Sequence, residues 1–298
     1  MPVISKQKSN PGFNLALSGG GVRACVHVGF YEVLREQGIP ITGVAGTSMG
    51  AIIGAAIALG YSSETIRKFF IKYRDFNMVS LRNFNFFNES LLKRDTLTTI
   101  LDEFFGASTF ADTKIPFACS AVDLESRKEI VFRKGSIARA VEASAAYPLL
   151  FPPLFHQSHY MIDGGILDEV PAVLARSLTS DPLIAIRVKN NVVRQYISGQ
   201  IYMKYYQHTQ KMGIIDAMKN IFKRKRFDFR LMLDIVLESI TIASELNVQK
   251  ILEEAKPDIL LEPVVDIGLL DFAKIDEAIE LGRKMAVKAL PQISTHLQ

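Results

Sequence analysis

One stretch of the sequence, residues 41–59, constrains the fold more than any other. It reads ITGVAGTSMGAIIGAAIAL and has Ser48 near its centre. Residues 41–45 are apolar enough for a short buried strand, and residues 51–59 for a helix with almost no polar face. Between them, residues 46–50 match the G-x-S-x-G pattern of a nucleophile elbow. The stretch therefore predicts a strand, a sharp turn and a buried helix.

The residue types of this pentapeptide suit a serine nucleophile. A sharp strand-to-helix turn crowds the backbone around its central residue, and Gly46 and Gly50 lack the Cβ atoms that would collide there. The Ser48 oxygen would then lie at a helix N-terminus, where free N–H groups and the helix dipole favour negative charge. The alternative is a glycine-rich turn whose serine only caps the helix. Because G-x-S-x-G also occurs by chance, the pentapeptide alone does not decide between the two.

A second glycine-rich turn comes earlier in the chain. Residues 13–17 predict a first buried strand, residues 18–23 read SGGGVR, and a helix is expected from about residue 24 to residue 37. A P-loop is excluded, because no Gly-Lys-Ser/Thr follows at the required spacing.

A dinucleotide-binding turn fits this loop only loosely. Gly19-x-Gly21-x-x-Ala24 follows a strand, as that fingerprint requires. The fingerprint also needs an acidic residue at the end of the second strand to hold the ribose. The second strand here ends in Ala45-Gly46 with no carboxylate nearby, which disfavours a dinucleotide site.

The remaining interpretation of the loop is an oxyanion hole. Successive glycines allow backbone N–H groups to point into a cavity, and a helix N-terminus reinforces them. Two consecutive strand-to-helix turns place both helix N-termini at one edge of a parallel sheet, where open α/β sheets have their sites. Ser48 would be the nucleophile there. Arg23 would hold the loop or add positive potential, or it is a solvated arginine on the first helical turn.

A carboxylate follows a short apolar strand later in the chain, in the sequence HYMIDGG. Asp163 ends the strand expected over residues 160–162, and Gly164 and Gly165 come directly after it. Such a carboxylate is held in a tight turn crowded by backbone. A solvated Asp-Gly reverse turn has the same residues, so the motif alone leaves both interpretations open.

Further strands and helices surround these motifs. Strands are expected over residues 115–123, 129–132, 182–188 and 259–262, and helices over residues 62–73, 137–146, 231–246 and 276–290. The last helix has one apolar face, made of Ile275, Ala278, Ile279, Gly282, Met285, Ala286 and Ala289.

Composition limits the classes of function. The 298 residues suffice for one large α/β domain or two modest ones, and a net charge of +4 does not predict a nucleic-acid partner. Cys25 and Cys119 are too few for a disulfide framework or a thiolate metal site, so a reducing cytoplasm is expected. We expect no secretory signal and no transmembrane segment, because no apolar run approaches the ~18 residues of a spanning helix.

Residues 190–240 differ from the rest and are interpreted as a basic amphipathic insert or cap. Ile214, Ile215, Met218, Ile221 and Phe222 fall on one helical face, and Lys219 and the cluster Lys223, Arg224, Lys225 and Arg226 lie beside or just beyond it. Such a helix can lie in a membrane interface, where each basic residue adds about 1 kcal/mol near anionic lipid. Alternatively the face packs on the core and the cluster is solvated. An RNA-binding patch lacks any accompanying recognition motif.

Taken together, the loop at residues 19–23, the pentapeptide at residues 46–50 and Asp163-Gly164-Gly165 resemble the patatin-like phospholipase family. The resemblance covers most of the chain outside residues 190–240, including ASAAYPLLFPP (residues 143–153), AVDL (residues 121–124) and PDILLEPVVDIGLLDF (residues 257–272). Two departures concern Ser18, where plant members often have Asp, and Glu169-Val170-Pro171, which replaces the more usual Asn-Pro. Neither is expected to touch the chemistry directly.

The resemblance implies a three-layer α/β/α fold with a mostly parallel central sheet, distinct from the α/β-hydrolases. It implies a catalytic dyad of Ser48 as nucleophile and Asp163 as base, without histidine, metal or cofactor. The implied oxyanion hole consists of Gly19, Gly20, Gly21 and Met49, and the implied supporting residues are Arg23, Gly46, Gly50, Gly164 and Gly165. The implied reaction is hydrolysis of an acyl ester, typically of a phospholipid or lysophospholipid, through an acyl-enzyme.

The histidines offer little for a catalytic triad. The chain has five: His27 in the first helix, His208 in the insert, His296 in the C-terminal tail, and His156 and His159 beside a proline-ended loop. Only the last two are plausible triad members. Ser48 also lies too early for a standard α/β-hydrolase with its late histidine. A carboxylate base has an ordinary pKa of ~3.9 and is weak for serine unless desolvation raises that pKa, which an apolar pocket would do.

These patterns predict a catalytic core over residues 12–190 and 241–290, interrupted by the insert. We expect a cytoplasmic lipid acyl hydrolase, peripheral at the membrane surface, with a lipid substrate and no nucleic-acid partner. One alternative is a soluble esterase or thioesterase of small acyl substrates. Another is a non-catalytic membrane-associated regulator, although a site that had lost its activity would have no reason to keep Ser48, Asp163 and the glycine loop.

Overall fold

The structure, a computed structural model, describes residues 12–74, 94–189 and 229–297. Eight strands of this part form one sheet in the order β5-β6-β3-β2-β1-β7-β8, with β4 paired to β3. The strands are β1 (Phe13–Leu17), β2 (Ile41–Gly46), β3 (Phe117–Asp123), β4 (Lys128–Phe132), β5 (Leu154–His156), β6 (His159–Asp163), β7 (Leu183–Ile186) and β8 (Ile259–Leu261).

Parallel pairing dominates the centre of the sheet. Strand β1 lies between β2 and β7 and is parallel to both, and the β2–β3 and β7–β8 pairs are also parallel. The strands β4, β5 and β6 add antiparallel pairs on the β3 side. The expected mostly parallel sheet is confirmed. The carboxyl ends of β1 and β2 meet at one edge, where Leu17 pairs with Gly46.

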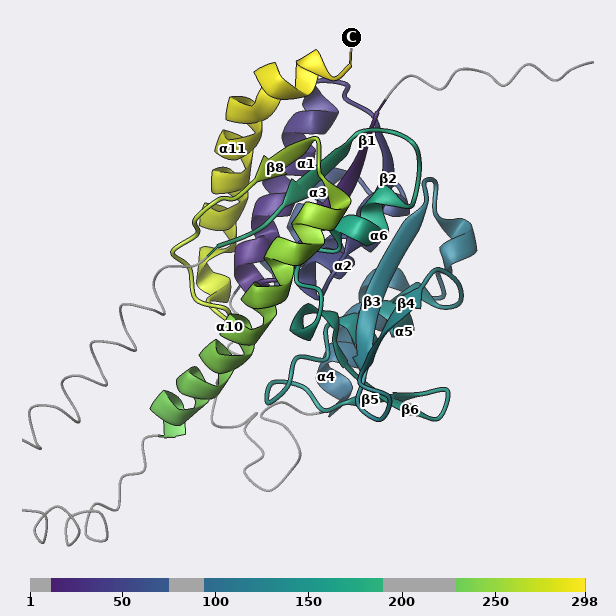
Figure 1. Ribbon diagram of the computed structural model, residues 1–298, viewed down its shortest axis with the longest axis vertical. Helices are drawn as coiled ribbons and strands as arrows, with labels where there is room; N and C mark the ends of the chain where they lie inside the picture. Colours follow the sequence, from purple (N-terminus) through teal and green to yellow (C-terminus); the bar gives the residue numbers. More distant parts are fainter. Residues whose placement is uncertain (1–11, 75–93, 190–228, 298) are drawn as a thin grey trace, which may run out of the picture.

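Helices cover both faces of this sheet, which gives the expected three layers (Figure 1). Helices α1, α2, α5 and α11 pack on one face, and α6 and α10 pack on the other. Side chains of β1 alternate between them: Leu15 and Leu17 belong to the first core, and Ala16 to the second. The helices are α1 (Val26–Glu36), α2 (Met49–Ala58), α3 (Ser63–Lys72), α4 (Arg94–Phe105), α5 (Ile137–Ser144), α6 (Ala172–Arg176), α10 (Phe229–Ala255) and α11 (Ile275–Thr295).

Helices α1, α10 and α11 differ from the expected bounds, α11 because it continues to Thr295, beyond residue 290. After the first glycine loop the chain forms a 3-10 helix (Gly21–Cys25) before α1 begins, because Gly20 and Gly21 have positive φ angles of 127° and 58°. Helix α10 extends beyond residues 231–246 at both ends. The apolar face expected for the last helix is confirmed, since all of its members are buried in α11 except Met285, which is partly buried.

Most of the basic insert lies outside the residues that the structure describes. Residues 190–228, with the cluster Lys223 to Arg226, are outside the described residues, so the amphipathic membrane-binding helix stays a prediction. The division of the chain into a core and an insert over residues 190–240 also stays a prediction, and α10 begins inside that range. Among the helices of the described part, none combines the length and the apolar character needed to cross a bilayer.

Candidate active site

Ser48 occupies a strained turn between β2 and α2. Its φ and ψ angles are 54° and −124°, outside the regions that L-residues favour. A Cβ on Gly46 would lie 2.2 Å from the Gly50 carbonyl oxygen, and one on Gly50 would lie 2.3 Å from that of Leu17. The backbone is therefore as crowded as a nucleophile elbow requires. Ser48 makes no side-chain capping hydrogen bond to α2, so the alternative of a simple helix cap does not hold.

The Asp163 carboxyl is buried at the end of β6, with only 1% of the residue exposed. The Gly165 amide donates a 2.7 Å hydrogen bond to Oδ1, while Oδ2 has no partner among the described residues. A Cβ on Gly164 would lie 2.3 Å from the Ser120 carbonyl oxygen, which explains why this turn needs a glycine. The turn packs against β3, so Asp163 does not belong to a solvated reverse turn.

Burial raises the pKa of Asp163 to about 7, although the Ser48 hydroxyl and the Gly165 amide both act to lower it. The Ser48 hydroxyl is near enough to influence the carboxyl, yet the two side chains form no hydrogen bond of normal geometry in the described part of the chain. Catalytic hydrogen bonds are often long before substrate binds. A carboxyl with a pKa near 7 is matched to general-base work at neutral pH.

The glycine loop passes directly beside Ser48. A Cβ on Gly19 would lie 3.2 Å from the Cβ of Ser48. The Gly19 amide donates to the Glu169 carbonyl oxygen at 3.2 Å, and the Val22 amide donates to that of Leu269 at 3.0 Å. The Gly19 amide is therefore occupied, and Gly19 lines the site without offering a donor.

The amides of Gly20 and Gly21 have no acceptor within the described residues. Met49 begins α2, so its amide also lacks a partner inside the helix. The Arg23 Nε donates to the Gly20 carbonyl oxygen at 3.1 Å and holds the loop, as one of the two interpretations of this arginine expected. We therefore retain Gly20, Gly21 and Met49 as candidate oxyanion donors.

Gly20→Ala should lower kcat by about 100-fold or more and change KM little, because each lost oxyanion donor costs 10²–10³-fold in kcat. A Cβ there has room, since its nearest neighbour would be 3.8 Å away, but the φ angle of 127° strains any L-residue. Gly135→Ala is the matched control, with a φ angle of 91° and open space far from the elbow. Steady-state kinetics of both variants test the role, and a change in KM alone would mean that the loop only shapes the pocket.

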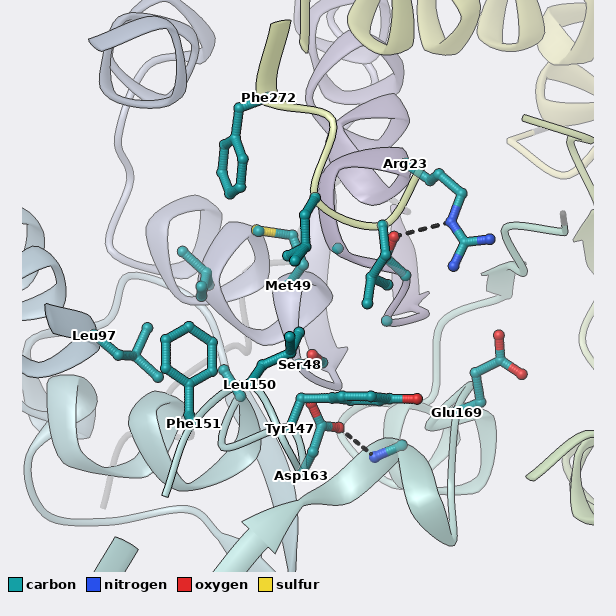
Figure 2. A pocket seen from close by; sticks show the side chains of 18 of the residues that line it. Arg23, Ser48, Met49, Leu97, Tyr147, Leu150, Phe151, Asp163, Glu169 and Phe272 are labelled. Atoms are coloured by element: carbon teal, nitrogen blue, oxygen red, sulfur yellow. Dashed lines mark hydrogen bonds between the residues drawn. The ribbon is translucent and has the colours of Figure 1, made fainter. Parts of the chain in front are cut away.

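Ser48 and Asp163 face one cavity of about 160 Å³ (Figure 2). Its wall on one side of Ser48 is apolar and includes Leu97, Leu150, Phe151 and Phe272. On the other side lie Arg23, Tyr147 and Glu169. The cavity thus has an apolar end and a polar end, with Ser48 between them.

Tyr147 and Glu169 are among the cavity residues that were not predicted as site residues. The Tyr147 ring lies beside Asp163, and its hydroxyl points toward the polar end (Figure 2). Glu169 was noted only as a departure from the family pattern. Burial raises its pKa, and its backbone carbonyl holds the glycine loop. The sequence around Glu169 does not indicate that Glu169 lines the cavity, because it reaches the glycine loop only when the chain folds.

Among the described residues, no histidine lines the cavity that Ser48 and Asp163 share. His159 lies on the β5–β6 hairpin, where its Nδ1 is 3.2 Å from Oδ2 of Asp123. His156, opposite it on β5, lies against the Phe132 ring. Neither lines the cavity that Ser48 and Asp163 share. The triad that the sequence left open is therefore not assembled.

These features define the class of the protein: an α/β fold in which two glycine-dependent turns bring Ser48 and Asp163 to one cavity. The sequence places it more narrowly. Residues 15–176 match the Patatin-like phospholipase family, and the chain belongs to that family. The fold and family expected from the motifs are confirmed.

Relatives support this assignment along most of the chain. An uncharacterized NTE family protein of Mycobacterium bovis is 26% identical over 97% of this chain and 48% of its own length. The lysophospholipase NTE1 of Meyerozyma guilliermondii is 26% identical over 94% of this chain and 19% of its own length. The chain thus spans about half the length of the bacterial relative, and less of the fungal one. The crystal structure of VipD from Legionella pneumophila has a similar fold, with a TM-score of 0.50 and 14% identity over 97% of this chain and 67% of VipD.

Proposed function

We propose that this chain is a serine acyl hydrolase that cleaves ester bonds of phospholipids or lysophospholipids. The observation that carries the proposal is the shared cavity, in which a strained serine, a buried carboxyl and loop amides without an acceptor among the described residues converge. Membership of the patatin-like phospholipase family supports the reaction class. The fungal relative named as a lysophospholipase supports the class of substrate.

The reaction proceeds in two stages. Asp163 takes the Ser48 proton as Oγ attacks the ester carbonyl carbon, and the oxyanion accepts hydrogen bonds from the Gly20 and Gly21 amides. The tetrahedral intermediate then expels the alcohol, which receives the proton from Asp163. The acyl group remains on Ser48 as an acyl-enzyme. A water molecule, deprotonated by Asp163, attacks this ester. The second tetrahedral intermediate formed in this way then collapses, which releases the fatty acid and returns the proton from Asp163 to Ser48.

The asymmetry of the cavity supports a lipid ester as substrate. An acyl chain suits the apolar end beside Leu97, Leu150 and Phe151, and the glycerol and head group suit the polar end. Apolar walls also keep water from Asp163 and sustain its raised pKa. Contact with a membrane surface through the basic insert is part of this proposal and rests on the sequence pattern of residues 214–226.

Vesicles that contain mixed phospholipids and lysophospholipids test the proposal directly. Wild-type protein should release free fatty acid, detected by mass spectrometry together with the remaining lipid, and Ser48→Ala should release none above background. Hydrolysis of small soluble esters alone would favour a soluble esterase or thioesterase. Absence of hydrolysis of any ester, with Ser48 unreactive toward a fluorophosphonate, would favour a non-catalytic regulator.

A further inference from the structure

A buried histidine lies behind the glycine loop, outside the cavity. His27 is on the first turn of α1, and only 1% of it is exposed. Its Nε2 lies 3.0 Å from the carbonyl oxygen of Ser18, the residue that joins β1 to the loop. His27 does not line the cavity, so it cannot exchange a proton with Ser48 or substrate.

The other polar groups of Ser18, and the Gly19 amide, also have hydrogen-bond partners. The Ser18 amide donates to the Ile186 carbonyl oxygen at 3.1 Å, and the Gly19 amide donates to Glu169 at 3.2 Å. The Ser18 Oγ donates to the Gly19 carbonyl oxygen at 3.1 Å and accepts from the Val188 amide at 3.0 Å. Within the described residues, the Ser18 carbonyl has His27 as its only hydrogen-bond partner.

The chemistry of this contact sets the tautomer of His27. A carbonyl oxygen only accepts, so Nε2 carries the hydrogen and Nδ1 is bare. Nδ1 is buried and has no partner among the described residues. Burial lowers the pKa of His27 to about 4, although the Ser18 carbonyl acts in the opposite direction, so the ring is neutral in the working range of Asp163.

The space around Ser18 leaves this carbonyl little freedom as long as His27 holds it. A Cβ on Gly50 would lie 2.5 Å from the Ser18 oxygen, so the carbonyl also packs against the first turn of α2. Without a donor, the oxygen would be buried and unsatisfied, which costs about 1–3 kcal/mol unless the peptide rotates. Rotation of the peptide between Ser18 and Gly19 would change the backbone orientation of Gly19, Gly20 and Gly21. The orientation of the loop amides thus depends on the donor.

We propose that His27 is a positioning residue for the oxyanion hole: its Nε2–H holds the Ser18 carbonyl and thereby fixes the direction of the Gly20 and Gly21 amides. The proposal rests on the proposed function, because it assumes that these amides stabilise an oxyanion. It assigns His27 a role in kcat without contact with the reacting atoms.

Substitutions at His27 can separate the donor from the volume of the ring. In His27→Gln the side-chain amide nitrogen can take the place of Nε2, whereas in His27→Asn it is too short to reach Ser18. His27→Phe keeps a ring and has no donor. Tyr31→Phe is the matched control, because it removes a partly buried 3.1 Å hydrogen bond to the Tyr61 carbonyl one turn further along α1 and away from the loop.

We expect His27→Phe and His27→Asn to lower kcat by roughly 10- to 100-fold, less than the loss of an oxyanion donor itself, with KM within about threefold of wild type. His27→Gln should recover most of kcat, and Tyr31→Phe should lose stability with kcat unchanged. Thermal melting checks folding. If His27→Phe fails to fold, the comparison of Gln with Asn carries the test. An unchanged kcat in His27→Asn, or a kcat equally low in folded His27→Gln and His27→Asn, overturns the proposal.

A second readout separates this proposal from the proposed function. The rate of Ser48 labelling by a fluorophosphonate also depends on the oxyanion donors, whatever the natural ester is. Wild-type protein that hydrolyses no ester would overturn the lipid-hydrolase proposal alone. Labelling that is slower in His27→Asn than in His27→Gln would still support the positioning role, and equal labelling rates in the two would overturn it.

Discussion

Ser48→Ala should abolish ester hydrolysis, with a loss of several orders of magnitude, and leave the fold intact. The loss follows because no acyl-enzyme can form without Oγ. Folding should survive because the elbow is shaped by Gly46 and Gly50, whose missing side chains relieve contacts of 2.2 and 2.3 Å. Fatty acid release and circular dichroism measure the two effects.

A fluorophosphonate should label Ser48 alone. Ser62→Ala is the matched control, because it removes a hydroxyl that caps α3 and does not line the cavity. That variant should keep both activity and labelling. Hydrolysis by Ser48→Ala at the wild-type rate, or a label on another residue, would contradict the acyl-enzyme mechanism.

Asp163→Asn should reduce kcat by about 10⁴-fold, the loss seen when asparagine replaces the aspartate of a serine triad. Asn cannot accept the Ser48 proton, although its size matches that of Asp. For the wild type, kcat/KM should rise about tenfold per pH unit below pH 7 and level off above it, because only the ionised carboxyl is a base and burial raises its pKa to about 7. A profile that falls as pH rises through 7 would assign Asp163 to acid chemistry.

The same substitution should stabilise the fold, and only at higher pH. The folded-state pKa of Asp163, about 7, lies above the ordinary value of 3.8, so the folded protein binds this proton more tightly than the unfolded chain does. The contribution of Asp163 to stability therefore falls as pH rises from about 4 to about 7. Because Asn imitates the neutral carboxyl, the gain of Asp163→Asn should be small at pH 4 and a few kcal/mol at pH 8, at about 1.4 kcal/mol per pKa unit.

Asp112→Asn provides a control of opposite sign. The Thr109 amide, followed by the Thr109 hydroxyl, lowers the pKa of Asp112, so this carboxylate stabilises the fold above its ordinary pKa. That variant should be less stable than wild type by a nearly constant amount from about pH 4 upward, because Asp112 is largely ionised there in both the folded and the unfolded state. Denaturant melts at pH 4 and pH 8 compare the two variants. Equal shifts of Asp163→Asn at both values would mean that Asp163 is not buried in its protonated form.

The local features of this protein could be predicted from its sequence. The β2–α2 elbow, the face of α11 and the N-terminal cap of α3 follow from spacing and residue type, because each depends on neighbours within a few positions. The glycines of the loop likewise identify a turn that bulky residues cannot form. The family resemblance then named Ser48 and Asp163 as partners, although 115 residues separate them.

Only the tertiary structure decided how these parts meet. Asp163 reaches Ser48 because β6 pairs with β3, at Ala121, and β3 pairs with β2, at Gly46. Pairings between distant strands leave no periodic trace in the sequence, and neither does the enclosure that raises the pKa of Asp163 to about 7. The same reason explains why the occupied amide of Gly19 and the donor role of His27 were not foreseen. Both depend on which carbonyl a folded neighbour brings within hydrogen-bonding distance.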